Sequence, residues 1–319
     1  MGNLLLIPLQ KDEKQMAKRI MTIFKWIIGF MVGAIVVLIA SVIIDRGIGA
    51  NRLDSLTNTV ITNGNDPAVR AYVARPSGEG PFPVVIMIHE WWGLKSEIVG
   101  KADALAQDGY IVVAPDVFRG NTTSWIPSAI WQVVSTPTTQ VDGDLDAVMR
   151  WIQNQPDADA QRVAIMGFCF GGGTSIRYGV NTPDIKATVV FYGAVIQDPT
   201  LLKNLNGPVL GIFGSADTMI PISEVQGFEQ GLKEAGVPHE VTIYEGEPHA
   251  FVTSIEDIAK GGNQLKAWNQ LRAFLQQTLY GQGYTRPIFV RNDTSSFTTS
   301  DTWGGNRLLH QFICDLTVN

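Results

Sequence analysis

The sequence predicts an α/β fold in which a mainly parallel sheet carries helices on both faces. Short apolar runs alternate along the chain with longer segments of helical periodicity, a pattern typical of strand–helix–strand units. The run 83–89 is apolar almost without interruption, as expected for a strand that is buried on both faces. The alternation extends from residue 68 to residue 280, a length that one α/β domain can contain.

Seven strands and five helices are expected in this domain. The strands cover residues 68–75, 83–89, 110–115, 162–166, 186–192, 208–213 and 239–244. The helices cover residues 96–108, 139–154, 170–180, 221–235 and 263–280. The aromatic-rich segment 121–137 is expected to form a cap, which either lines an apolar pocket or covers the core.

The most informative segment is Gly167-Phe-Cys-Phe-Gly-Gly172, which lies between an expected strand and an expected helix. Its glycines flank Cys169 at a distance of two residues, where a sharp turn brings neighbouring backbones too close for side chains. This is the context of a nucleophile elbow, with a thiol in place of the usual hydroxyl. A buried structural cysteine in a glycine-rich turn is the alternative interpretation.

Two further residues have the order along the chain that such a nucleophile requires, with the acid before the base. Asp217 follows the strand 208–213, and His249 follows the strand 239–244. Because open α/β sheets gather their ligands at strand ends, we expect these side chains to meet Cys169. The sequence therefore predicts a triad of Cys169, His249 and Asp217.

The loop after the strand 83–89 is expected to complete the site. In this architecture one backbone N–H of that loop helps to form the oxyanion hole, together with the N–H of the residue after the nucleophile. These donors would be Trp91 and Phe170. His89 directly precedes the loop, so we expect it to orient the loop by a hydrogen bond rather than to transfer protons.

The chain resembles the dienelactone hydrolase family, within the α/β-hydrolase superfamily, over about residues 57–280. The resemblance rests on the segments His89-Glu-Trp-Trp-Gly93, Ala114-Pro-Asp-Val-Phe-Arg-Gly120, Gly167-Phe-Cys-Phe-Gly-Gly172, Gly214-Ser-Ala-Asp217 and Tyr244-Glu-Gly-Glu-Pro-His-Ala-Phe251. It implies that the triad opens a lactone or ester through an acyl-enzyme, and that Glu90 contacts the thiol before substrate arrives. It also implies that Arg119 helps to bind a substrate carboxylate, although a solvated loop arginine is the alternative.

The chain departs from the family pattern at one position, because Thr253 stands where members that cleave dienelactone have a second arginine. The expected substrate is therefore a small-molecule lactone or carboxylic ester other than a muconate-type lactone. A thioesterase or carboxylesterase of other specificity, and a catalytically silent subunit of a membrane assembly, are the alternatives. Neither a metal nor a cofactor is expected, since the sequence has no H-E-x-x-H motif and no paired Cys/His spacing.

The N-terminal part predicts a membrane anchor over residues 26–44, which contain no charged residue. At 1.5 Å per residue these positions span about 28 Å, close to the thickness of the hydrocarbon core. Basic residues outnumber acidic ones in residues 1–25, so the positive-inside rule places this segment in the cytoplasm. We therefore expect a single-pass membrane protein with an extracytoplasmic catalytic domain. Its anchor could also bind a partner within a membrane complex.

The net charge excludes nucleic-acid binding, and the C-terminal segment and the second cysteine receive no functional role. The net charge of −6 offers no electrostatic field for nucleic acid. Residues 281–319 form a polar tail without periodicity, and the sequence assigns it no function. We expect no disulfide between the two cysteines, because the chemistry accounts for Cys169 and because Cys314 lies in this tail.

Overall fold

The computed structural model describes residues 7–281, with side chains for 15–48 and 52–281. The chain divides into two compact units, Met1–Ile48 and Gly49–Asn319. The predicted tail beyond Gly281, and with it Cys314, lies outside the described residues. The predicted boundaries at residues 25, 44, 57 and 280 stay predictions, although the second unit contains the whole α/β sheet described below.

The described residues of the first unit belong to one helix, α1 (Ile7–Leu53), whose last five residues are counted in the second unit. Its segment Gln15–Ile48 is long and apolar enough to cross a membrane. In the most apolar stretch of this segment, no residue is buried inside the protein. A signal sequence near an N-terminus has the same properties. The last residue of the helix, Leu53, is fully buried in the core of the second unit.

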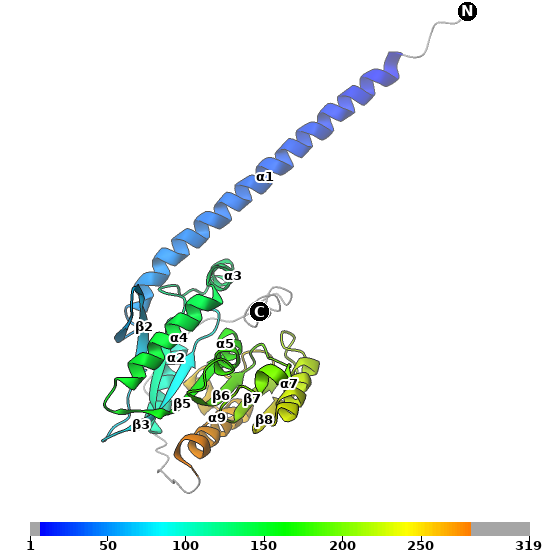
Figure 1. Cartoon of the computed structure of the whole chain (residues 1–319). Coiled ribbons are helices and arrows are strands. Elements are labelled where there is room, and N and C mark those ends of the chain that lie inside the picture. Colours follow the sequence, from blue (N-terminus) through cyan, green and yellow to red (C-terminus); the bar gives the residue numbers. More distant parts are fainter. Residues whose placement is uncertain (1–6, 282–319) are drawn as a thin grey trace, which may run out of the picture. The chain divides into compact units, whose positions relative to one another are not determined.

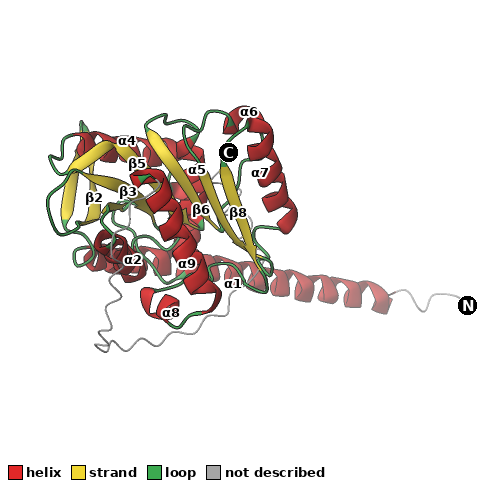
Figure 2. Cartoon of the chain, turned by 90° about the horizontal axis from the view of Figure 1, so that it is seen from below, coloured by secondary structure: helices red, strands yellow, loops and turns green. Residues whose placement is uncertain are grey.

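Eight strands form one twisted sheet in the second unit (Figures 1 and 2). They are β1 (Thr59–Asn63), β2 (Asp66–Ala74), β3 (Phe82–Ile88), β4 (Ile111–Pro115), β5 (Ala158–Phe168), β6 (Ile185–Phe191), β7 (Val209–Gly214) and β8 (His239–Tyr244). Their order in the sheet is β1-β2-β4-β3-β5-β6-β7-β8. The strands from β4 to β8 are parallel, whereas β2 is antiparallel to both of its neighbours.

Helices cover both faces of this sheet (Figure 2). They are α2 (Ser96–Gln107), α3 (Ile126–Ser135), α4 (Thr138–Gln153), α5 (Phe170–Gly179), α6 (Pro199–Leu202), α7 (Ile222–Ala235), α8 (Ile255–Ala259), α9 (Gly262–Leu275) and the π-helical turn η1 (Gln276–Tyr280). Alternate residues of β3 enter two separate apolar clusters, Val85 and Met87 in one, Ile86 and Ile88 in the other. This two-sided burial explains why β3 is apolar throughout.

The structure differs from the prediction mainly at the edges of the domain. Strand β1, which was not predicted, pairs with β2 through a two-residue turn at Gly64 and Asn65, and Gly64 has a φ of 60°. A glycine at the first position of such a turn accepts this φ without strain, so the hairpin closes tightly. The expected cap 121–137 contains helix α3. Trp131 on this helix and Trp125 directly before it are exposed, whereas Ala129 and Val133 are buried.

Candidate active site

Cys169 lies at the sharp turn between β5, which ends at Phe168, and α5, which begins at Phe170. Its φ of 53° is a left-handed conformation that is costly for a residue with a side chain. The backbone N–H of Cys169 donates to the carbonyl of Phe191 on β6 over 3.0 Å, which ties the turn to the neighbouring strand. The side chain is 3% exposed, at the N-terminal end of the helix.

The glycines around Cys169 are required by close backbone contacts. A Cβ on Gly167 would lie 2.2 Å from the carbonyl carbon of Gly171, and a Cβ on Gly171 would lie 2.3 Å from the carbonyl oxygen of Ile88. Both distances are far below any van der Waals contact between these atoms. The turn is therefore packed so tightly against itself and against β3 that only glycine fits at either position.

Asp217 and His249 are in direct contact. Asp217 follows β7 and His249 follows β8, and His249 Nδ1 lies 2.8 Å from Asp217 Oδ2. The other carboxylate oxygen, Oδ1, accepts backbone N–H bonds from Met219 at 2.7 Å and from Ile220 at 3.1 Å. The carboxylate of Asp217, whose side chain is fully buried, is thus fixed in one orientation, and a His249 Nδ1–H donates to it.

His249 is also electrostatically coupled to Cys169. Burial alone lowers the pKa of His249, but the negative charge of Cys169 and hydrogen bonds to Asp217 and Cys169 outweigh it and raise this pKa to about 10. The second ring nitrogen, Nε2, is buried without a close oxygen or nitrogen partner. The ring therefore presents Nε2 on the side away from Asp217, and the arrangement favours a thiolate–imidazolium pair.

The two predicted oxyanion donors lie on elements that meet at the elbow. Trp91 is buried in the loop after β3, and its carbonyl accepts a short hydrogen bond from Nε2 of Gln132 on the cap helix α3. Phe170 is the first residue of α5, so its N–H points out of the N-terminal end of that helix. Both groups are backbone donors, and the helix end adds a favourable partial positive charge.

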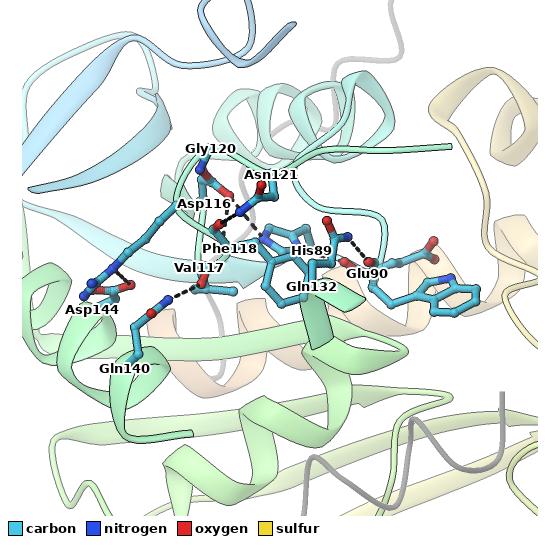
Figure 3. A network of polar contacts seen from close by, with 12 residues as sticks. His89, Glu90, Asp116, Val117, Phe118, Gly120, Asn121, Gln132, Gln140 and Asp144 are labelled. Carbon is cyan, nitrogen blue, oxygen red and sulfur yellow. Dashed lines mark hydrogen bonds and ion pairs between the residues drawn. The ribbon is translucent and has the colours of Figure 1, made fainter. Parts of the chain in front are cut away.

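His89 supports this loop as expected (Figure 3). Its Nδ1–H donates to the carbonyl of Glu90 over 2.7 Å (Figure 3), while its ring packs with those of Phe118 and Phe170 at centroid distances of 4.9 and 6.3 Å. Complete burial lowers the pKa of His89 to about 4, so the ring is neutral at physiological pH. The neutral, enclosed imidazole thus orients this loop through its hydrogen bond to Glu90.

Asp116 organises the neighbouring loop after β4 (Figure 3). Its carboxylate accepts backbone N–H bonds from Phe118 and Gly120, and its Oδ1 lies 3.9 Å from His89 Nε2. Burial raises the pKa of Asp116 to about 6, although these two N–H donors oppose the shift. The carboxylate of Asp116 thus fixes its own loop, and the segment after it is joined to the loop after β3 by the N–H of Thr123, which donates to the carbonyl of Trp92 over 2.9 Å.

The two predicted substrate-binding residues have different surroundings. Burial raises the pKa of the Glu90 carboxyl, while the positive charges of Lys101 and His249 lower it, so Glu90 is within electrostatic reach of the triad. Arg119 instead makes a two-pronged ion pair with Asp144 of α4, at 2.7 and 3.1 Å. A substrate carboxylate would have to compete with Asp144 for this guanidinium.

Two residues near the site were missed by the sequence interpretation. Tyr192, with a φ of 39°, is fully buried, and its ring meets that of His249 edge-on at a centroid distance of 5.2 Å. Lys101 of α2 is 1% exposed and donates to the carbonyl of Thr253, four residues after His249. A tyrosine directly after an apolar strand is a detectable signal, whereas a lysine on a helix is ordinarily taken as exposed. Within residues 7–281 no cluster of three or more His, Cys, Asp or Glu side chains could hold a metal ion.

A mainly parallel sheet with a strained strand–turn–helix elbow, and with an Asp–His contact at the ends of two further strands, defines an α/β-hydrolase. Within that class the chain belongs to the dienelactone hydrolase family, because the profile described as "Dienelactone hydrolase family" matches residues 69–279. The fold predicted from the sequence and the resemblance to this family are therefore confirmed.

Named relatives agree with this assignment. A "Putative carboxymethylenebutenolidase" of Salmonella typhimurium is 35% identical over 196 residues, which are 57% of this chain and 72% of the relative. A protein with the same description from Methylorubrum extorquens is 30% identical over 226 residues, 66% of this chain and 78% of the relative. The crystal structure of a "Putative Dienelactone Hydrolase" from Klebsiella pneumoniae has a TM-score of 0.60 at 30% identity, covering 69% of this chain and 100% of that one. The chain is thus a hydrolase of ester or lactone bonds.

Proposed function

We propose that the chain cleaves a small-molecule lactone or carboxylic ester through an acyl-enzyme on Cys169. In the first half of the reaction the Cys169 thiolate attacks the carbonyl carbon, and the N–H groups of Trp91 and Phe170 stabilise the oxyanion. The C–O bond then breaks, and the imidazolium of His249 gives its Nε2 proton to the departing oxygen. With a lactone, the alcohol released in this step remains attached to the acyl chain.

In the second half, neutral His249 takes a proton from water, which attacks the thioester carbonyl of the acyl-enzyme. The new oxyanion collapses, the C–S bond breaks, and the acid leaves while Cys169 and His249 return to their starting charges. Asp217 holds the tautomer with Nδ1–H throughout, because it accepts that proton's hydrogen bond and carries a compensating charge.

The observation that carries this proposal is the 2.8 Å contact between His249 and Asp217, together with the electrostatic coupling of His249 to the cysteine of the elbow. A catalytically silent subunit would not need a left-handed cysteine, nor a buried carboxylate that three donors hold in place. Strain and buried charge both cost stability, and they persist at functional sites where chemistry requires them.

The two cysteines of the chain provide a matched test. The full-length protein in detergent should hydrolyse p-nitrophenyl acetate, and stoichiometric alkylation of one cysteine should abolish this activity. Cys169→Ala should reduce turnover by at least about 10³-fold, whereas Cys314→Ala should leave it unchanged. Hydrolysis at the wild-type rate by the Cys169→Ala protein would show that the triad does not carry the reaction.

The residue at position 253 supports a neutral substrate. Thr253 has no positive charge, and its hydroxyl lies 2.7 Å from Asp257 Oδ2. Since Arg119 is also paired with Asp144, the described residues offer no obvious free cation for a substrate carboxylate at these two positions. We therefore expect neutral lactones and short-chain esters to be turned over at least as well as dienelactone, which a comparison of kcat/KM values would check.

We also propose that α1 anchors the enzyme in a membrane, with the catalytic domain outside the cytoplasm. The support is the apolar segment Gln15–Ile48 of α1 and the excess of basic residues before its most apolar part. A reporter that works only outside the cytoplasm should be active when it is fused after Asn319, whereas a reporter that works only in the cytoplasm should be inactive there. Recovery of the fusion in the membrane fraction with its N-terminus intact distinguishes an anchor from a cleaved signal sequence, and reporter activity in the cytoplasm would refute the orientation.

A further inference from the structure

Lys101 is a buried cation that contacts the segments carrying two members of the proposed triad. It is 1% exposed, and its ammonium donates to the carbonyl oxygen of Thr253 in the loop that follows His249. The same nitrogen lies 4.4 Å from the ring centroid of Phe168, the residue directly before Cys169. One side chain of α2 thus reaches both the nucleophile strand and the histidine loop.

A lysine at such a depth requires compensation, because a buried ammonium loses its hydration. Burial lowers the pKa of Lys101 to about 8, and nearby carboxylates oppose this shift. In order of effect these carboxylates are Glu90 on the loop after β3, Glu97 on α2, and Asp257 and Glu256 on α8. The strongest opposite charge on Lys101 is therefore the glutamate of the active-site loop.

The interaction is reciprocal. Burial raises the pKa of the Glu90 carboxyl, and Lys101 is the largest single influence that lowers it, ahead of His249 and Lys95. Without the ammonium, a carboxyl in this position would take up a proton more readily. Lys101 and Glu90 therefore influence each other's charge, although α2 and the loop after β3 supply them separately.

We propose that Lys101 is a positioning residue, whose buried ammonium holds the His249 loop through the carbonyl of Thr253 and supplies a positive charge beside the nucleophile strand, in the field of Glu90. It does not contact the reacting atoms, and it acts through this hydrogen bond and through its charge. The inference rests on the proposed function, since Glu90 matters only if Cys169 reacts. It makes the charge of the site depend on a side chain of α2, which lies outside the triad and its loops.

The experiment follows the alkylation of Cys169 by iodoacetamide between pH 6 and 9.5, in the full-length Cys314→Ala chain without substrate. In this background we expect the rate constant of alkylation to fall as the pH rises through about 8, because the Cys169 thiolate loses a nearby positive charge when Lys101, with a pKa of about 8, deprotonates. This fall appears as an inflection in the pH profile. Lys101→Arg should stay at the faster level and Lys101→Met at the slower one, both without the inflection. Glu90→Gln should move the inflection to lower pH by about one unit or more.

The exposed Lys233 of α7 provides the matched control, and Lys233→Met should keep the wild-type profile. If the Lys101→Met chain does not fold, the doubly substituted Glu90→Gln/Lys101→Met chain is used instead, because it does not leave the Glu90 carboxylate buried without the ammonium. Its pH profile should also lack the inflection. Profiles of the Lys101 variants that superimpose on the wild type, or an inflection that Glu90→Gln does not move, would overturn the inference. A chain whose Cys169 is no more reactive than an ordinary thiol would instead overturn the proposed function.

Discussion

Replacing Asp217 by asparagine should disable the site through a change of tautomer. Oδ1 of Asp217 accepts two backbone N–H bonds, at 2.7 Å from Met219 and 3.1 Å from Ile220. An asparagine side chain can satisfy these donors only with its oxygen in the same position. Its NH₂ group must then occupy the Oδ2 position, 2.8 Å from His249 Nδ1.

An NH₂ group at this position forces Nδ1 to accept a hydrogen bond, so that the ring proton moves to Nε2. The nitrogen that should act as a base toward Cys169 and water is then a donor, and the imidazolium also loses its counter-charge. We expect the rate of p-nitrophenyl acetate hydrolysis to fall by about 10³- to 10⁴-fold, equivalent to about 4–5.5 kcal/mol of transition-state stabilisation.

The control is Asp184→Asn, the same chemical change at an exposed position, which should keep the wild-type rate. Combining Asp217→Asn with His249→Ala should cost little more than His249→Ala alone, because the two side chains act as a unit. A rate within tenfold of wild type for Asp217→Asn, in a protein with an unchanged unfolding temperature, would refute the tautomer argument.

Two further outcomes follow from the elbow and from its histidine. Gly171→Ala would place a Cβ 2.3 Å from the carbonyl oxygen of Ile88, so it should lower the free energy of unfolding by about 2–3 kcal/mol. By contrast, Gly143→Ala in α4 meets no atom within 4 Å and should stabilise the protein by about 0.5–1 kcal/mol in the same denaturant titration. Because the pKa of His249 is raised to about 10, the imidazolium that protonates the leaving group persists up to that pH. Activity limited by this step should therefore fall as the pH rises through about 10, and an alkaline limb near the ordinary histidine value of 6.5 would contradict the coupling to Cys169.

The order of the elements could be predicted because each strand of the central sheet has a pattern of its own. Strand β3 is apolar at every position since both faces are covered, and the glycines around Cys169 mark a turn that no other residue fits. Strand β1 escaped prediction because its pattern is half polar, with only Ile61 and Asn63 buried. An edge strand gains its structure from the partner strand rather than from its own sequence.

The proposed catalytic residues could be selected from the sequence because parallel strands present their carboxyl ends at one edge of the sheet. Cys169, Asp217 and His249 each follow such a strand, and the contact between the last two is present in the structure. The ion pair of Arg119 with Asp144 could not be foreseen, since it depends on where α4 packs against the loop after β4.

By itself, the sequence determined the class of fold, the position of the elbow and the strand ends at which the polar residues gather, because local periodicity and glycine spacing specify these features. Only the tertiary structure decided which charges are buried together. Lys101 belongs to an amphipathic helix, and its sequence pattern predicts a surface residue. In the structure its ammonium is enclosed by Phe168 at the end of β5 and by the histidine loop at Thr253. Burial, and hence the charge state of a side chain, depends on contacts between distant segments, which no local pattern records.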